Sequence, residues 1–162
     1  MHFSEIDSYL QLLQDDGFEL VQSEDKEDAQ SWWRINYKTP EGRGLPTFFT
    51  IGKDTILWQF PISISPVDDI CQKALSRYLL LLNHELKLVR FTLDDDNQVH
   101  LIVELLNNNM SFLTMKTVFN VIRAYYDQYH QSIRLLATNP QLAEAWISLR
   151  SRSDVEVSFV TD

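Results

Sequence analysis

Residues 86–105, LKLVRFTLDDDNQVHLIVEL, decide the fold because they predict two strands joined by a tight turn. Apolar residues occupy every second position on both sides of the acidic centre: Val89, Phe91 and Leu93, then Val99, Leu101 and Val103. A short loop that ends at Asn97 pairs Leu93 with Val99, so that the apolar faces of the two strands match. Asn97 then takes the left-handed position, which asparagine tolerates better than most residues. The stretch therefore predicts an antiparallel β-hairpin.

The acidic centre of this stretch, DDDN at residues 94–97, could also hold a metal ion. An EF-hand loop that began at Asp94 would need glycine at its sixth position and glutamate at its twelfth. Val99 and Leu105 stand at those positions. The stretch therefore predicts a turn with solvated carboxylates, and we expect neither a metal site nor a cofactor.

The hairpin register leaves one candidate for chemistry on the outward face of the sheet. It places His100 beside Thr92, with Glu104 further along the same face and Arg90 on the neighbouring strand. These three side chains, Arg90, His100 and Glu104, could serve acid–base chemistry or hold a small ligand if they met in a pocket. A solvated sheet face is the more ordinary interpretation, so we treat the set as an alternative site.

Patterns in the first half of the chain predict more strands. A first helix is expected between Ser4 and Gly17, because glycine accepts the left-handed conformation that ends a helix. Strands are expected at residues 18–20, 31–37, 47–51 and 55–62. The last of these alternates strictly through Ile56, Trp58, Phe60 and Ile62. Strands that follow one another through short turns favour an antiparallel sheet of about five to six strands, with helices packed on it, and hence an α+β fold.

Three further helices are expected. Ser65 and Pro66 are suited to begin one that runs to about Asn83. A long helix is expected over residues 112–137, and Asn139-Pro140 then starts a last one. The apolar stripe of the first of these helices is Val67, Ile70, Cys71, Ala74, Leu75, Tyr78 and Leu82. That of the long helix is Met115, Phe119, Ile122, Tyr126, Tyr129, Ile133 and Leu136. That of the last helix is Leu142, Ala143, Trp146 and Ile147. The tail, residues 151–162, is expected to be a short edge strand or a loose end.

Charge and cysteine content narrow the classes of function. The chain has 162 residues, a net charge of −9 and a pI near 4.8. An acidic domain repels phosphate, which argues against binding to nucleic acid or anionic lipid. One cysteine, Cys71, permits no disulfide framework, and no apolar run approaches the roughly 20 residues of a membrane span. We therefore expect a cytoplasmic protein.

The sequence contains no motif that names a reaction. It lacks a glycine-rich phosphate loop and the patterns HExxH, GxSxG and CxxC. His84 and His130 each lack a second candidate ligand at metal-binding spacing. Cys71 is expected on the buried face of a helix, where a thiol is usually inert. We therefore do not expect an enzyme.

Adjacent aromatic residues suggest a binding surface. Neighbours on a strand, such as Trp32 and Trp33 or Phe48 and Phe49, must point to opposite faces of the sheet. Either the chain itself covers both faces, or one face meets a partner. The residues expected to give apolar contacts to a protein partner are Trp32, Phe49, Trp58, Tyr125 and Tyr126.

Residues 74–122 resemble the YbjN-like family, whose members share the fold of type III secretion chaperones. The resemblance lies in LLLLNHELKLVRFTLDDDNQVHLIVEL and in NNNMSFLTMKTVFNVI. These segments contain a helix that ends in Leu82-Asn83, two strands about an acidic turn, a polar link and a long helix. Asn97 stands where the turn in such proteins often carries glycine, and the segment beyond Asn139 is extra.

The resemblance implies one α+β domain over residues 1–138, followed by a C-terminal helix and tail over residues 139–162. It also implies a non-enzymatic, protein-binding module, either chaperone-like or a regulatory or assembly factor. Secretion chaperones are small, acidic and often dimeric, so we expect a homodimer. By this likeness a partner would be held by its apolar side chains, with strand addition at a sheet edge as a further mode.

Overall fold

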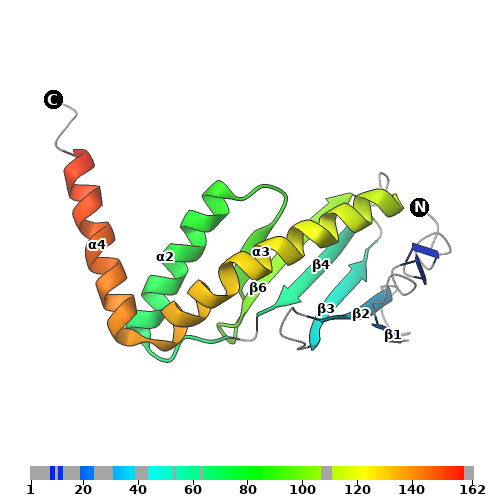
Figure 1. Cartoon of the computed structure of the whole chain (residues 1–162), viewed down its shortest axis with the longest axis horizontal. Coiled ribbons are helices and arrows are strands. Elements are labelled where there is room, and N and C mark those ends of the chain that lie inside the picture. The colour runs from blue at the N-terminus through cyan, green and yellow to red at the C-terminus, as the bar shows by residue number, and fades with distance from the viewer. Residues whose placement is uncertain are drawn as a thin grey trace.

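The computed structural model describes residues 8–9, 11–12, 19–23, 31–38, 44–52, 54–62, 64–106 and 111–158 (Figure 1). Within these ranges, the side chains of residues 19–23, 31–33, 35, 37–38, 44–46 and 152–158 are not described. Residues 8–9 and 11–12 are helical, so a helix does lie near the start of the chain. Its expected limits at Ser4 and Gly17 lie outside the described residues.

The described chain forms one antiparallel sheet and three long helices. The strands are β1 (Glu19–Ser23), β2 (Ser31–Lys38), β3 (Gly44–Ile51), β4 (Thr55–Pro61), β5 (Arg90–Leu93) and β6 (Val99–Leu106). The helices are α2 (Asp69–Glu85), α3 (Phe112–Thr138) and α4 (Pro140–Ser158). The expected α+β class with an antiparallel sheet and packed helices is confirmed.

The order of strands across the sheet is β1-β2-β3-β4-β6-β5. The first four strands form a meander, in which each strand pairs with the next. The chain then crosses through α2 and returns as the β5–β6 hairpin, whose second strand pairs with β4. As a result β5 forms one edge of the sheet, next to α2.

The core lies between the sheet and the helices. Ile56, Trp58, Phe60 and Ile62 are all buried, so the face on which they alternate is the one turned toward the core. α3 lies across the sheet (Figure 1), and its Phe119 ring is 5.2 Å from Trp58 and 5.8 Å from Phe60. The expected stripe of α3 is buried except for Tyr129, which is half-buried. The indole Nε1 of Trp58 donates a hydrogen bond of 3.2 Å to Thr47, a fully buried threonine on β3.

The start of α2 differs from the expectation. Asp68, not Ser65, is the N-cap residue, and its side chain accepts a hydrogen bond from the backbone N–H of Cys71. The hydroxyl of Ser65 instead accepts a hydrogen bond from the Gln98 side chain. Val67, which precedes the helix, and Ile70, in its first turn, are exposed, and Tyr78 is half-buried. The buried stripe is Cys71, Ala74, Leu75, Leu79 and Leu82.

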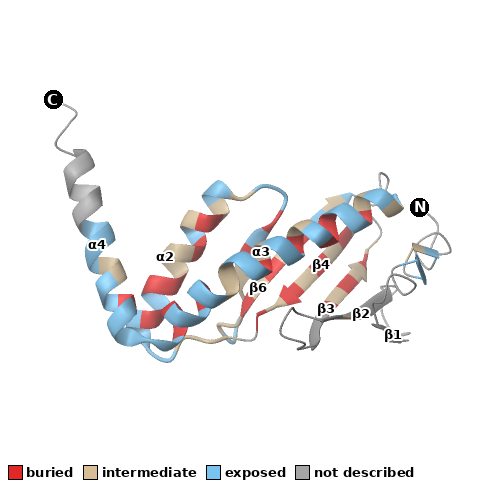
Figure 2. Cartoon of the chain, in the orientation of Figure 1, coloured by how far each residue is buried: buried red, intermediate tan, exposed pale blue. Residues whose placement is uncertain are grey.

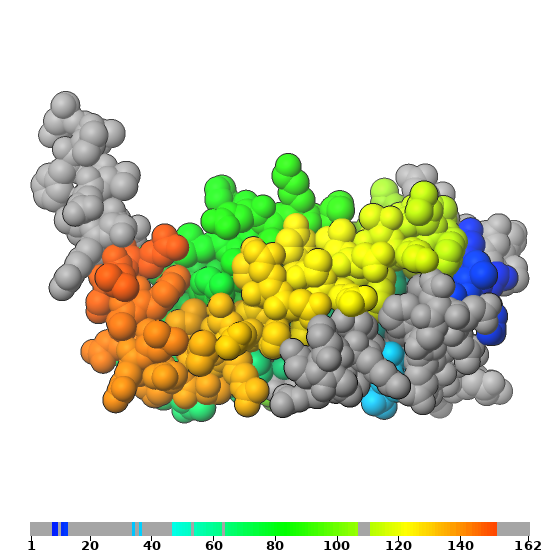
Figure 3. All heavy atoms as spheres, in the orientation of Figure 1, coloured from blue at the N-terminus to red at the C-terminus, as the bar shows by residue number. Residues whose placement is uncertain are grey.

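A second, smaller cluster joins α4 to the domain. It consists of Cys71, Ala74, Leu136 and Ala143, with Tyr78, Trp146 and Ile147 packed against it. Asn139 caps α4 by accepting a hydrogen bond from the Leu142 N–H. α4 then turns away from α3, and most of its described surface is exposed (Figures 2 and 3). It continues to Ser158, so the edge strand or loose end expected from residue 151 is wrong over residues 151–158.

Candidate functional site

Two pockets of the described chain lie beside the β5 edge of the sheet. The first, here named the α2–β5 groove, has a volume of about 240 Å³. Its lining residues are Ser76, Leu79, Leu80, Asn83, Phe91 and Leu93. Most of this lining is apolar, which suits the side chains of a partner protein.

Helix geometry explains how the groove arises. Leu79 and Leu82 point inward and are buried, so their neighbour Leu80 must leave the core. Leu80 is 70% exposed at the rim of the groove, whereas Phe91, on β5, is buried beneath it. Leu80 is one of several large apolar side chains that are exposed in the described chain, and it stands at the edge of this groove.

Asn83 joins the two walls of the groove. Its side-chain amide donates a hydrogen bond of 2.8 Å to the Phe91 carbonyl oxygen. The amide oxygen accepts another of 2.7 Å from the Phe91 N–H. The last turn of α2 is thereby fixed to β5, and the orientation of the Asn83 amide follows from its backbone partners.

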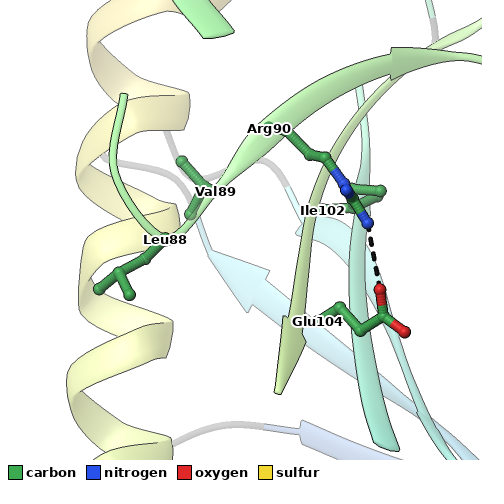
Figure 4. A pocket seen from close by; sticks show the side chains of 5 residues that line it. All are labelled: Leu88, Val89, Arg90, Ile102 and Glu104. Atoms are coloured by element: carbon green, nitrogen blue, oxygen red, sulfur yellow. Dashed lines mark hydrogen bonds and ion pairs between the residues drawn. The ribbon is translucent and has the colours of Figure 1, made fainter. Parts of the chain in front are cut away.

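The second pocket, of about 280 Å³, lies beside the first residues of β5. Its lining residues are Leu88, Val89, Arg90, Ile102 and Glu104 (Figure 4). Arg90 reaches toward Glu104 and forms an ion pair of 3.1 Å. Both side chains are about half exposed, at 56% and 49%. The two charges therefore neutralise each other in contact with solvent, where an ion pair contributes little free energy.

His100 belongs to a different set of contacts. Its Nε2 lies 2.8 Å from Asp94 Oδ2, and its Nδ1 lies 3.0 Å from Gln59 Nε2. These distances fit a ring that donates to Asp94 and accepts from Gln59. The hydrogen bond from His100, followed by that from the Gln98 N–H, lowers the pKa of Asp94. The alternative site is thus divided into two pairs: His100 lies with Asp94, and Arg90 lies with Glu104.

The turn between β5 and β6 has the expected geometry. Leu93 pairs with Val99 and Thr92 with His100, and Asn97 has a φ of 58°. Asp94 Oδ1 accepts hydrogen bonds from the backbone N–H groups of Asp96 and Gln98. The predicted hairpin is therefore confirmed. Over the part of the chain that the structure describes, no three of the His, Cys, Asp and Glu side chains gather in a way that could hold a metal ion.

The aromatic residues expected to contact a partner lie mostly in the core. Phe49 is 0% exposed, Trp58 1% and Tyr126 7%. These three side chains belong to the core and line neither pocket, whereas the expectation placed them at a contact surface. Tyr125 is half-buried and stacks on Tyr129 at 6.2 Å. The side chain of Trp32 lies outside those described, although its backbone pairs with Thr50.

Cys71 is buried, as expected from its place on α2. Burial raises the pKa of its thiol, and the neighbouring Asp68 adds to this effect. A raised pKa keeps the thiol protonated, which disfavours nucleophilic chemistry. Burial also raises the pKa of Tyr78, although a hydrogen bond with Ser132 opposes the shift.

Comparisons with known proteins bear on the fold. A chain of the heterodimeric complex ExoU-SpcU, from the type III secretion system of Pseudomonas aeruginosa, has a similar structure. The TM-score is 0.53 at 14% sequence identity, over 82% of this chain and 97% of that chain. The secretion-chaperone-like fold is thereby supported.

Sequence comparisons add no family. No family model matches the chain, and no curated protein matches it either. Membership of the YbjN-like family therefore stays a prediction. None of the described helices is both long and apolar enough to cross a membrane.

Leu80 and Asn83 were not expected to form a site. Leu80 lies in a run of four leucines, residues 79–82, and a helix can bury only part of such a run. That excess was a usable signal for an exposed apolar residue. Asn83 gave no such signal, because its role depends on where β5 lies in space.

Proposed function

We propose that this chain is a non-enzymatic, chaperone-like module that binds another protein, with the α2–β5 groove as its contact surface. The observation that carries the proposal is the exposed Leu80 above the apolar floor formed by Leu79, Phe91 and Leu93. The secretion-chaperone-like fold gives independent support. The occupant is a segment of a partner protein that inserts apolar side chains into the groove.

The test is suppression of aggregation of a model client, for which we choose reduced insulin. We expect the native chain to suppress aggregation of the insulin B chain at near-equimolar ratios, and Leu80→Asp to lose most of that effect. Leu113→Asp is the matched control, because Leu113, in the first turn of α3, is 73% exposed against 70% for Leu80. Equal suppression by native chain and Leu80→Asp would contradict the proposed groove, and no suppression by the native chain would contradict the proposed function.

A homodimer also stays a prediction. Light scattering on a sizing column at several concentrations measures it directly. If the chain is a dimer that buries Leu80, the groove is the dimer contact, and Leu80→Asp should yield monomers. If it is a monomer, or a dimer with Leu80 accessible, the groove stays available to a different protein.

The alternative function, a small-ligand binder or enzyme that uses Arg90, His100 and Glu104, has less support. The pocket beside Arg90 and Glu104 favours it. The pairing of His100 with Asp94, and of the two other side chains with each other, opposes a single site.

A further inference from the structure

β5 occupies an edge of the sheet, and the directions of its backbone groups follow from the hairpin. Asp94 N–H bonds to the Gln98 carbonyl across the turn, at 3.1 Å. In an antiparallel pair, hydrogen-bonded and non-hydrogen-bonded positions alternate. The Thr92–His100 pair is therefore hydrogen-bonded, and the Phe91–Leu101 pair is not. It follows that the N–H and C=O of Phe91 point away from β6, toward the edge.

These two groups are the ones that an added strand would use. A residue of an antiparallel strand accepts from the N–H and donates to the C=O of the residue opposite. The Asn83 side chain already makes both hydrogen bonds, at 2.7 Å and 2.8 Å. Its amide thus takes the place that a peptide group of a seventh strand would take.

Other features of β5 act in the same direction. The strand has only four residues, and short edge strands resist pairing. The preceding Leu88 has a φ of 71°, which breaks the extended path that a longer edge would need. α2 packs beside β5 and supplies Asn83 from its last turn.

We propose that Asn83 prevents strand pairing at β5, because its side chain occupies both outward backbone groups of Phe91. When Asn83 is substituted, we expect the exposed edge to pair with β5 of a second copy of this chain. Two identical edges can pair antiparallel about a twofold axis. A partner at the α2–β5 groove is then held by side chains, not by strand addition. The edge closure itself does not depend on the proposed function.

The test compares Asn83→Ala with the native chain at equal concentration. Alanine removes both hydrogen bonds while favouring the helix. We expect the Phe91 amide to exchange its hydrogen at least about tenfold faster in the monomeric fraction, which equals about 1.4 kcal/mol of lost protection. We also expect the variant to reach at least twice the native mass by sedimentation, with an infrared band of intermolecular β-structure.

Two further variants keep the test decisive. Asn83→Leu fills nearly the same volume without a donor or acceptor, so it serves if the alanine variant does not fold, and the same association is expected. Asn83→Asp retains the acceptor for the Phe91 N–H and places a charge at the edge. We expect Asn83→Asp to keep the native mass.

Association through the opened groove is a separate possibility, and Leu80→Ala distinguishes it. If Asn83→Ala and the double variant with Leu80→Ala associate equally, the edge is responsible, as proposed. Loss of association in the double variant would assign it to the groove and overturn the proposal. Native mass in both Asn83→Ala and Asn83→Leu, whether or not the Phe91 amide exchanges faster, would also overturn it, because Asn83 would then only fasten α2 to β5.

Discussion

The two faces of the sheet differ in the contacts that their side chains make. On the face beneath the helices, Trp58 packs against Phe49 on the neighbouring strand and Phe119 on α3, with both ring distances at 5.2 Å. On the other face, the neighbours of Trp58 along β4 are Leu57 and Gln59, which are only partly buried. The described contacts on that side of the sheet include two ion pairs, Arg90–Glu104 and His100–Asp94.

This difference separates stability from recognition. Burial of aromatic and aliphatic surface gives the helix-covered face most of the favourable free energy. Pairs exposed to water, as on the open face, add little. The open face and the β5 edge can therefore change with little effect on folding, whereas the covered face cannot. Four experiments test this contrast: three substitutions, each compared with a control position, and one double-mutant cycle.

Trp58→Ala should give the largest effect, since it empties the centre of the covered face. Removal of a buried tryptophan side chain costs about 3–5 kcal/mol of the free energy of unfolding. Leu57→Ala, the adjacent residue on the open face, should cost about 1 kcal/mol. Urea denaturation followed by circular dichroism measures both. Equal losses would show that the two faces are equally packed.

Thr47→Val should give the next largest effect. Valine keeps the shape of threonine but leaves the buried Trp58 N–H without its acceptor, which costs about 1–3 kcal/mol. Thr50→Val, at a half-buried position on the same strand, should stay within about 0.5 kcal/mol of the native chain. The same denaturation experiment applies. If the two valine variants are equally stable, the Trp58–Thr47 hydrogen bond contributes nothing.

The Arg90–Glu104 pair should contribute less. Both side chains are about half exposed, so solvent screens their attraction. A double-mutant cycle with Arg90→Ala and Glu104→Ala should give a coupling free energy below about 1 kcal/mol, and added salt should reduce it. A coupling free energy above about 2 kcal/mol would mean that the open face is shielded from water. That result would favour the alternative ligand site at Arg90, His100 and Glu104.

Asp94→Asn should lower stability at neutral pH, and this effect should fade at low pH. The pKa of Asp94 is lowered in the folded chain, and the unfolded value is near 3.9. The stability that the carboxylate adds is therefore complete above about pH 3.9 and is lost as the pH falls through the lower folded value. The difference in urea midpoint between native and Asp94→Asn should shrink from pH 7 to pH 3. Asp95→Asn, in the same turn, is the control. If its urea midpoint changes with pH in the same way, the hydrogen bonds of Asp94 are not the cause of the effect.

Local periodicity was enough to predict much of the covered face. The alternation through Ile56, Trp58 and Phe60, and the spacing of Met115, Phe119 and Ile122, each fix which side of an element faces the core. The hairpin register followed from matching two such faces. These features depend on neighbours in sequence, so the sequence alone was sufficient.

The functional candidates depended on tertiary contacts and were less predictable. Phe49 and Trp58 were expected to contact a partner, but both lie on the inward face of the sheet and belong to the core. Ser65 was expected to cap α2, but a side chain from the distant β-hairpin uses its hydroxyl. Asn83 acquires its role only because β5 lies beside α2, and no local pattern indicates that.

The pairing of β4 with β6 has a consequence for synthesis of the protein. Trp58 lies opposite Val103, and α2 and β5 lie between them in the chain. A ribosome therefore releases the whole β1–β4 meander before the strand that completes it exists. Until β6 emerges, β4 is itself an open edge with large apolar side chains, and edges of that kind pair with other chains. A released chain that ends after α2 should thus aggregate more readily than the full chain.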